Sequence, residues 1–423
     1  MEDRVADAEP ALSDATTLAS LLVTEGAGGH SVRRLSNDAL RAIRIHLGMD
    51  VAFISEFTGG ERVFRYVDAA SEQCPVRVGD ADPLEQSYCQ RVVDGRLPEL
   101  IRDAGALPAA AELPVTAELP VGAHLSIPIR LADGRVYGTL CCFSATADDS
   151  LNDRDLAMMR VFADLTAAQL DRDLERERRE VETVTRLQAA IAGEGVRMVF
   201  QPIIDIDSRG PIGFEALARF GSAPSRGPDV WFTEAAALGL AVDLELTAVG
   251  LALRDLPRLP AHAYLAVNVS PATAVSGRLD AMLSDVAVHR VVLEITEHHI
   301  IDRYDQLEAA LAGLRRRGLR IAVDDAGAGY ASFRHILRLR PDLIKLDMTL
   351  TRDIDRDRPR RALASALISF ARDTGSAIVA EGVETAEELR TVRLLGVTAA
   401  QGYHVGRPTE LSCISQPKVP TRI

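Results

Sequence analysis

From residue 196 to residue 406, short apolar runs alternate with longer segments whose apolar residues recur at three- and four-residue spacing. The short runs predict β-strands, and the longer segments, such as WFTEAAALGLAVDLELTAVGLALRDL, predict helices. The strand candidates are MVFQPII, GFEALARF, AYLAVNVS, RVVLEITE, RIAVDDAG, LIKLD, SAIVAEGVE and AAQGYHVG. Eight strands that alternate with helices over ~210 residues predict the α/β class and a (β/α)8 TIM-type barrel.

The connection between the first two strand candidates departs from this rhythm. Only DIDSRGPI separates FQPII from GFEAL. A crossover between parallel strands needs about a dozen residues or more, usually with a helix. We therefore predict a modified barrel whose first strand runs antiparallel to the second.

The pattern before residue 170 is different. DALRAIRIHLGM has helical spacing, whereas DVAFISEF and RVFRYVD alternate like paired strands around the turn TGGE. AHLSIPIRL and RVYGTLCCFS form a second predicted hairpin around ADG. This order predicts an α+β domain built on an antiparallel sheet. The expected organisation is a tail (1–15), this domain (16–170), a connecting helix (171–195), the barrel (196–410) and a second tail (411–423).

A long helix is predicted between the two regions. Residues 151–195 have apolar positions at helical spacing, charges of alternating sign in DRDLERERRE, and no proline or glycine before Gly193. Two interpretations are open: a solvated connector, or a dimerising signalling helix. The second is the basis for expecting a homodimer.

Composition narrows the classes of partner. The formal net charge is -13, which argues against a nucleic-acid polymer or a membrane surface as the partner, because both select a basic face. No apolar run approaches the ~20 residues of a membrane span, and the acidic N-terminus lacks the features of a signal peptide. The five cysteines show neither a disulfide framework nor zinc-type spacing. We expect a cytoplasmic protein.

Polar residues gather at the predicted strand ends, where the chemistry of barrels of this kind is placed. Many converging carboxylates repel one another and are tolerated where cations lie among them. Oxygen ligands with one amide suit Mg²⁺ or Mn²⁺ better than zinc, and the adjacent Asp324 and Asp325 could serve two metals. These residues are Gln201, Glu215, Asn268, Glu294, Glu297, Asp324, Asp325, Lys345, Asp347, Glu381, Glu384 and Gln401.

The motif series in the same region resembles that of the EAL-domain phosphodiesterases. It comprises QP, EAL, NVS, EITE, DDAGAGY, KLD, EGVE and QGY, in order, over about half of the chain. The resemblance implies a barrel with an antiparallel first strand and hydrolysis of cyclic di-GMP to the linear dinucleotide pGpG, with Mg²⁺ or Mn²⁺ as cofactor.

The resemblance also implies a role for each matched residue. The expected metal ligands are Glu215, Asn268, Glu294, Asp324 and Asp325, with Asp324 bridging two ions. Lys345 would orient the attacking water, and Glu381 would position or deprotonate it. Substrate contacts are expected from Gln201, Arg219 and Gln401. Supporting contacts to the ligands and their loops are expected from Glu297, Glu384 and Asp347.

The fifth-strand loop departs from the family pattern. It reads DDAGAGYAS, with Ala326 where the family commonly has Phe and Ala331 where it commonly has Ser. The loop thereby loses an aromatic side chain that would pack it. This departure keeps a second hypothesis open, in which the region is a degenerate EAL domain that binds cyclic di-GMP or another protein without catalysis.

Residues 16–170 resemble a GAF domain in the segments SYCQRVVDGRLPELIRDA, SIPIRLADGRVYGTLCCFS and LNDRDLAMMRVFADL. The resemblance implies a regulatory sensor that binds an unknown small ligand. Cys89 lies where some relatives attach a bilin, but Gln90 follows it in place of the usual His, so we expect a packed thiol. Cys141 and Cys142 alternate on a predicted strand, so at least one should be in the core.

Overall fold

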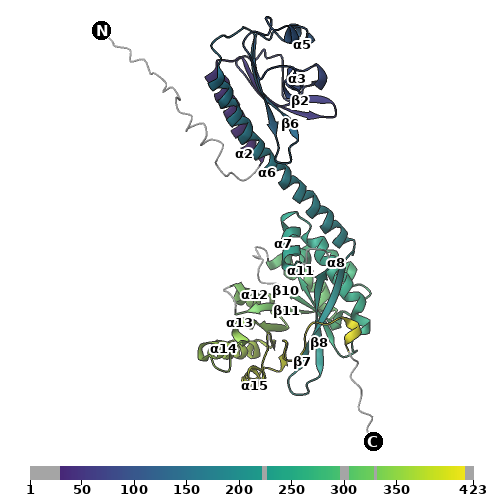
Figure 1. Cartoon of the computed structure of the whole chain (residues 1–423). Coiled ribbons are helices and arrows are strands. Elements are labelled where there is room, and N and C mark those ends of the chain that lie inside the picture. The colour runs from purple at the N-terminus through teal and green to yellow at the C-terminus, as the bar shows by residue number, and fades with distance from the viewer. Residues whose placement is uncertain (1–28, 222–225, 296–303, 328–330, 415–423) are drawn as a thin grey trace, which may run out of the picture. The chain divides into compact units, whose positions relative to one another are not determined.

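The computed structural model describes residues 29–221, 226–295, 304–327 and 331–414 of the chain, and Figure 1 shows their course. The chain divides into two compact units, Met1–Arg179 and Glu180–Ile423. Within the described ranges, every helix is too short or too polar to cross a lipid bilayer.

The first unit is an antiparallel sheet between two layers of helices. Its strands lie in the order β3-β2-β1-β6-β5-β4, and every neighbouring pair is antiparallel. In chain order the elements are α2 (Gly29–Leu47), β1 (Val51–Thr58), β2 (Glu61–Ala69), β3 (Ala81–Pro83), α3 (Tyr88–Val93), β4 (Leu100–Ile101), α4 (Pro108–Ala111), α5 (Pro114–Glu118), β5 (Ala123–Arg130), β6 (Val136–Ser144) and α6 (Asp153–Ile191).

Each face of this sheet has its own core. On one face, Leu40 and Ile43 of α2 and Met159 and Phe162 of α6 pack on the strands, and Figure 1 shows these two helices side by side. On the other face, the short helices α3, α4 and α5 cover a second apolar cluster. Because side chains alternate along β6, Cys141 belongs to the second cluster and its neighbour Cys142 to the first.

Both predicted hairpins of this unit are confirmed. Strands β1 and β2 pair along their length, and Thr58 opposite Glu61 is the pair next to the turn. Gly59 and Gly60 between them have φ of 61° and 83°, a left-handed conformation that glycine adopts without steric cost and that two-residue hairpin turns need. Strands β5 and β6 form the second hairpin.

The predicted long helix is α6, which has 39 residues. Its first half supplies Met159 and Phe162 to the core of the first unit. Its last turns belong to the second unit, where Leu187 and Ala190 pack with Trp231, and both are fully buried. The residues from 175 to 182 between these halves are exposed.

The second unit is a closed barrel in the order β10-β11-β12-β13-β14-β7-β8-β9. Its elements are β7 (Val196–Asp205), β8 (Pro211–Phe220), α7 (Pro228–Ala237), α8 (Ala241–Asp255), β9 (Tyr264–Val269), α9 (Pro271–Val275), α10 (Arg278–Met282), β10 (Val291–Ile295), α11 (Tyr304–Arg316), β11 (Arg320–Ala326), α12 (Ala331–Leu339), β12 (Leu343–Leu346), α13 (Met348–Thr351), α14 (Arg358–Thr374), β13 (Ala377–Ala380), α15 (Ala386–Leu394) and β14 (Ala399–Ala400).

The orientation of the first barrel strand confirms the prediction made from the short connection. Strand β7 is antiparallel to both of its neighbours, β8 and β14. The other strand pairs of the barrel are parallel. The fold is therefore the modified (β/α)8 barrel, preceded by an α+β unit.

Alternation along the strands separates two apolar layers. In β8, Phe214, Ala216 and Ala218 are buried, and the first two pack with the surrounding helices in the main core. A smaller cluster includes Ile203, Tyr264, Ala266 and Val292, which alternate along their own strands with residues of the main core, and it fills the barrel interior. The odd-numbered residues of β8, including Glu215 and Arg219, lie on this interior face.

The helical segment WFTEAAALGLAVDLELTAVGLALRDL is confirmed as helical, and it contains a break. The structure has two helices, α7 and α8, with a break at Gly239. Gly239 has a φ of 72°, and the Leu240 N–H donates to the Ala235 carbonyl, which closes the end of α7. Glycine in the left-handed region commonly ends helices in this way.

Candidate active site

Adjacent strands bring the predicted polar residues to one end of the barrel. Glu215 lies on β8, Asn268 on β9, Glu294 on β10 and Asp324 on β11. The register of the parallel strands places Asn268 beside Glu294, and that of the hairpin places Gln201 opposite Glu215. Side chains from different strands therefore lie at the same level of the barrel.

Lys345 of β12 is at the centre of this group. Its Nζ lies 2.7 Å from Glu381 Oε1, 2.8 Å from Glu294 Oε2 and 3.1 Å from Asp324 Oδ1. Glu215 Oε2 is 3.8 Å away. The lysine side chain is only 2% exposed, so the ammonium has exchanged water for carboxylates. One cation therefore holds four acidic side chains from four different strands or strand ends.

Amide side chains bind the same carboxylates from the other side. Asn268 Nδ2 donates to Glu215 Oε1 at 2.9 Å, and Gln401 Nε2 donates to Glu215 Oε2 at 2.6 Å. Gln401 Nε2 also lies 3.0 Å from Gln201 Oε1, and Gln201 Nε2 donates to the Gly406 carbonyl at 3.1 Å. Both oxygens of Glu215 thus have donors, which accounts for a buried carboxylate in the middle of a strand.

The charges in this cluster do not balance. Burial raises the pKa of Glu294 well above its ordinary value, Lys345 opposes this, and Glu215 and Asp324 raise it further. Burial and the neighbouring carboxylates likewise raise the pKa of Glu381, against the effect of Lys345. Burial lowers the pKa of Lys345, but the surrounding carboxylates outweigh this and raise it. Four carboxylates against one ammonium leave a site that favours additional positive charge.

The residues present fit a divalent cation. Carboxylate oxygens of Asp324, Asp325 and Glu381 lie within 4.8 Å of one another. Asp325 has a φ of 54°, unusual for a residue other than glycine, and its N–H donates to Asp324 Oδ1 at 3.0 Å. Gln401 Oε1 is buried and lacks a hydrogen-bond partner among the described residues. An all-oxygen donor set with excess negative charge is suited to Mg²⁺ or Mn²⁺.

Two predicted site residues lie away from the cluster, a third lies on the face of β8 that carries Glu215, and a fourth falls outside the described ranges. The Asp347 carboxylate caps α13 and accepts from the Thr349 N–H at 2.9 Å. Glu384 is 43% exposed and lies 3.4 Å from Arg352. Arg219 shares the interior face of β8 with Glu215, and its Nη1 donates to the Ala218 carbonyl. Glu297 falls on residues outside the described ranges.

Two supporting carboxylates were not anticipated from the sequence. Glu388, only 4% exposed, accepts from the N–H groups of Glu384, Thr385 and Asp353 at 2.8, 3.0 and 2.9 Å. It thereby ties the loop that follows Glu381 to the loop between α13 and α14. Its signal in the sequence is the capping box TAEE at the start of α15. Glu245 similarly accepts from the Ser270 N–H at 2.8 Å, just beyond Asn268.

The rarity of lysine in the sequence is a second signal that points to the site. The chain has 48 lysines and arginines, and only two of them, Lys345 and Lys418, are lysines. A compact ammonium fits among several carboxylates, whereas the planar guanidinium of arginine presents its N–H donors in a fixed fork geometry. In a chain that otherwise uses arginine, a lysine within a strand indicates a position where only the ammonium fits.

The fold and the site together define a class: barrel proteins with an acidic, lysine-centred site at the carboxyl ends of their strands. The chain belongs to the EAL domain family, whose sequence profile matches residues 184–408. The profile of the GAF domain matches residues 29–171.

Known proteins similar to the chain include the cyclic di-GMP phosphodiesterase PdeF of Escherichia coli, 28% identical over 56% of this chain and 33% of PdeF. The blue light- and temperature-regulated antirepressor BluF of E. coli is 30% identical over 48% of this chain and 52% of BluF. The chain therefore spans about a third of the length of PdeF and about half of that of BluF. The structure of the EAL domain of Xanthomonas citri FimX, solved with cyclic di-GMP, is similar to the chain with a TM-score of 0.51 and 22% sequence identity. The match covers 56% of this chain and 96% of the FimX chain. At that identity it supports the fold alone.

Proposed function

We propose that the barrel hydrolyses cyclic di-GMP to pGpG in a reaction that depends on Mg²⁺ or Mn²⁺. The observation that supports this most strongly is the set of four carboxylates around Lys345 at the carboxyl ends of the barrel strands. The relationship to PdeF, which is named as a cyclic di-GMP phosphodiesterase, supports the choice of substrate.

Five residues would hold the cations: Glu215, Asn268, Glu294, Asp324 and Asp325. When bound, the cations supply positive charge to the scissile phosphate and lower the pKa of water. The negative charge of the chain is then compatible with an anionic substrate. All five residues offer an oxygen ligand, and four of them are carboxylates.

The remaining residues have distinct proposed tasks. Glu381 accepts the proton of the attacking water, a role suited to a carboxyl whose pKa burial has raised. Lys345 holds Glu381 in place through the 2.7 Å ion pair and orients the water. Arg219 binds a phosphate oxygen from the interior face of β8, and the Gln201–Gln401 pair fixes Glu215. The 3′ oxygen of the cleaved bond leaves in line with the attack.

Separate measurements of binding and rate test these assignments. Glu381→Gln keeps the shape of the side chain and removes its basicity, so it should reduce kcat and leave cyclic di-GMP binding nearly unchanged. Glu384→Gln is the matched control, because Glu384 is in the same loop but 43% exposed, and it should change neither quantity. Loss of binding with unchanged kcat in Glu381→Gln would contradict the role given to Glu381.

We further propose that the first unit is a GAF sensor that regulates the barrel through α6, with the chain as a homodimer. The test compares turnover and oligomeric state of the full chain with those of residues 180–423. The fragment should begin there because Leu187 and Ala190 pack in the barrel unit. Identical turnover and identical oligomeric state in both would contradict regulation by this unit.

A second candidate function is binding without catalysis. It is favoured by Ala326 in the fifth-strand loop and by the relationship to BluF, which is named as an antirepressor. Retention of all the carboxylates named above supports catalysis instead. Tight binding of cyclic di-GMP without turnover under both metals would establish the second function and refute the first.

A further inference from the structure

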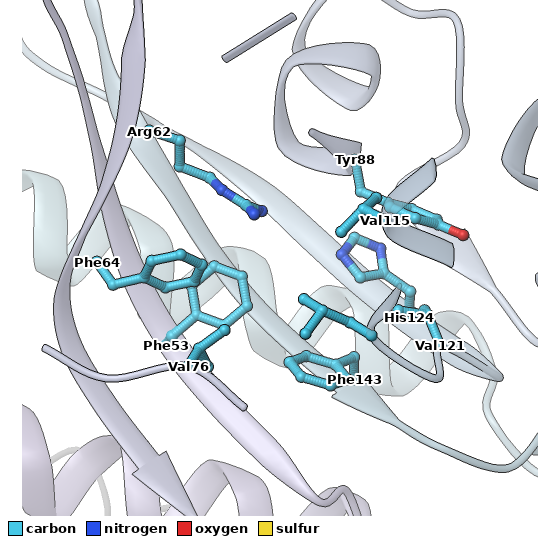
Figure 2. Close-up of a pocket in the computed structure, with 10 residues that line it drawn as sticks. Phe53, Arg62, Phe64, Val76, Tyr88, Val115, Val121, His124 and Phe143 are labelled. Carbon is cyan, nitrogen blue, oxygen red and sulfur yellow. The ribbon is translucent and has the colours of Figure 1, made fainter. Parts of the chain in front are cut away.

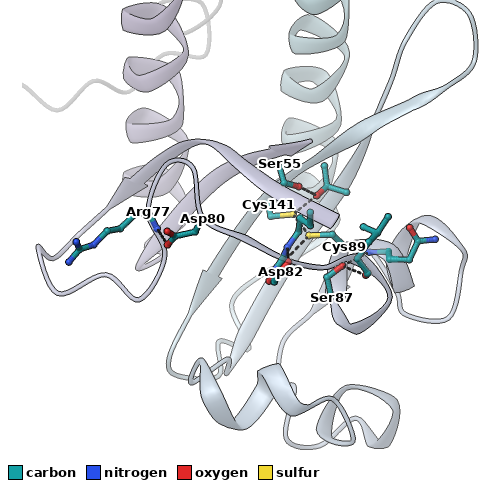
Figure 3. A network of polar contacts seen from close by, with 11 residues as sticks. Ser55, Arg77, Asp80, Asp82, Ser87, Cys89 and Cys141 are labelled. Atoms are coloured by element: carbon teal, nitrogen blue, oxygen red, sulfur yellow. Dashed lines mark hydrogen bonds and ion pairs between the residues drawn. The ribbon is translucent and has the colours of Figure 1, made fainter. Parts of the chain in front are cut away.

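A polar cluster lies within the first unit, on the sheet face that α3 covers (Figure 3). Its centre is formed by Cys89 of α3 and Cys141 of β6, whose Sγ atoms are 3.4 Å apart. Both side chains are fully buried, which confirms the packed position expected for Cys89. They are free thiols. A disulfide bond needs ~2 Å between the sulfurs, so a small movement would join them.

A buried cation lies beside this thiol pair. Arg62 of β2 is 4% exposed, and its Nη1 is 3.1 Å from Cys89 Sγ. The Arg62 Nε donates to Asp82 Oδ1 at 2.9 Å, and Nη2 also binds the Asp82 carboxylate. The guanidinium lies 4.6 Å from the ring centroid of Phe64. These contacts hold the cation against the sulfur, and a thiolate is a far better partner for it than a neutral thiol.

We propose that Cys89 and Cys141 are a peroxide-reactive thiol pair, in which Cys89 attacks a small hydroperoxide and Cys141 resolves the product as a disulfide. Arg62 stabilises the attacking thiolate. The site is distinct from the barrel chemistry and does not depend on the proposed phosphodiesterase function.

The ionisable groups around Cys89 favour this division of roles. Burial raises the pKa of the Cys89 thiol, but the hydrogen bond from Cys141 and the charge of Arg62 outweigh it and lower the pKa to about 5. Burial and the nearby Cys89 raise the pKa of Cys141 well above its ordinary value. The other groups of this cluster are Asp82, which pairs with Arg62, and His124, which burial keeps neutral by lowering its pKa to about 3. One thiol is therefore the nucleophile and the other the proton donor.

Arg62 also lines a pocket in the first unit (Figure 2). Arg62, Phe64, Tyr88 and His124 are among its lining residues, and its empty space of ≈ 300 Å³ includes the part open to solvent. The pocket has room for about one water-sized molecule. His124 Nδ1 is buried without a hydrogen-bond partner among the described residues. Arg62 joins this space to the buried Cys89 sulfur, and the space admits a molecule of the size of hydrogen peroxide.

The chemistry balances without another reactant. The Cys89 thiolate attacks one peroxide oxygen, the O–O bond breaks, and the departing oxygen takes a proton to give water from hydrogen peroxide. Cys89 is then a sulfenic acid. Cys141 sulfur attacks Cys89 sulfur, the S–O bond breaks, and the hydroxide leaves as water with the proton of Cys141. The two sulfurs together lose two electrons, which the peroxide has accepted.

Mass spectrometry of the full chain tests the pair directly. In a Cys74→Ser, Cys413→Ser background, hydrogen peroxide should lower the intact mass by about 2 Da and link the Cys89 and Cys141 peptides. Cys142→Ser, the matched control, should behave identically because Cys142 is equally buried but faces the other core. Cys141→Ser should stop at a dimedone-reactive sulfenic acid on Cys89, and Cys89→Ser should leave Cys141 reduced. An unchanged mass, or a bridge that includes Cys142, would overturn the proposal.

The pH dependence of the rate tests the role of Arg62. With Arg62 present, oxidation should be nearly independent of pH between about 6 and 8, because Cys89 is already a thiolate. In Arg62→Met the rate should rise about tenfold per pH unit over the same range. Asp82→Asn keeps the Arg62 cation and should retain the flat pH profile. It therefore tests the role of Arg62 even if Arg62→Met fails to fold. A steep profile in both the parent and Asp82→Asn would show that Arg62 does not stabilise the thiolate.

Discussion

Replacing Lys345 with methionine removes the ammonium that lies within 4 Å of four carboxylates and leaves the shape of the side chain nearly unchanged. Removing one partner of a buried ion pair costs about 3–5 kcal/mol, because the remaining charge is left uncompensated. For a unit of this size, 1 kcal/mol corresponds to ~2–4 °C in Tm. Without metal, the barrel transition of Lys345→Met should therefore fall on the order of 10 °C.

Calorimetry of the full chain, in EDTA and then in saturating Mn²⁺, measures this effect. Mn²⁺ supplies the missing positive charge, so the deficit of Lys345→Met should shrink when metal is present. Lys418→Met replaces the only other lysine of the chain and serves as the control. If Lys345→Met matched the parent in EDTA, the electrostatic account of the site would be refuted. An equal deficit in EDTA and Mn²⁺ would refute the cation site.

Three further results are expected. Glu388→Gln weakens the anchor of the Glu381 loop, so kcat should fall while a stability loss of about 1–3 kcal/mol appears in calorimetry. Ala326→Phe adds a ring to a fully buried position and should destabilise the barrel by about 1–3 kcal/mol, as measured by its melting transition. His124 has a pKa lowered to about 3 by burial and Arg62, so the unfolded chain binds the proton more readily. The free energy of unfolding of the first unit should fall by about 2 kcal/mol between pH 7 and pH 5 in denaturant titrations, and it should fall by less in His124→Gln.

The barrel and most of the candidate site could be predicted from the sequence because the decisive information is local. The eight residues of DIDSRGPI are too few for a parallel crossover, and β7 is antiparallel as that length requires. Alternation along each strand and the rule that barrel sites lie at strand ends place Glu215, Asn268 and Glu294 together. The structure brings them within contact of Lys345 or of one another.

The rest depends on contacts that the sequence does not encode locally. Asp347 lies two positions after Lys345, which suggests the same face, but β12 ends at Leu346 and the alternation ends with it. Its carboxylate caps α13 instead. The contacts among Arg62, Cys89 and Cys141 join residues 27 and 52 positions apart and depend on how α3 packs on the sheet. No spacing along the chain predicts that geometry.

The central claim is that the barrel cleaves cyclic di-GMP with the help of a divalent cation. The most direct measurement follows the conversion of cyclic di-GMP by the full chain in Mn²⁺, in Mg²⁺ and in EDTA, with Glu215→Gln alongside. The expected product is pGpG with either metal, with none formed in EDTA and none from Glu215→Gln, although that variant remains folded. Bound but uncleaved cyclic di-GMP in both metals, or equal turnover in EDTA, would contradict it.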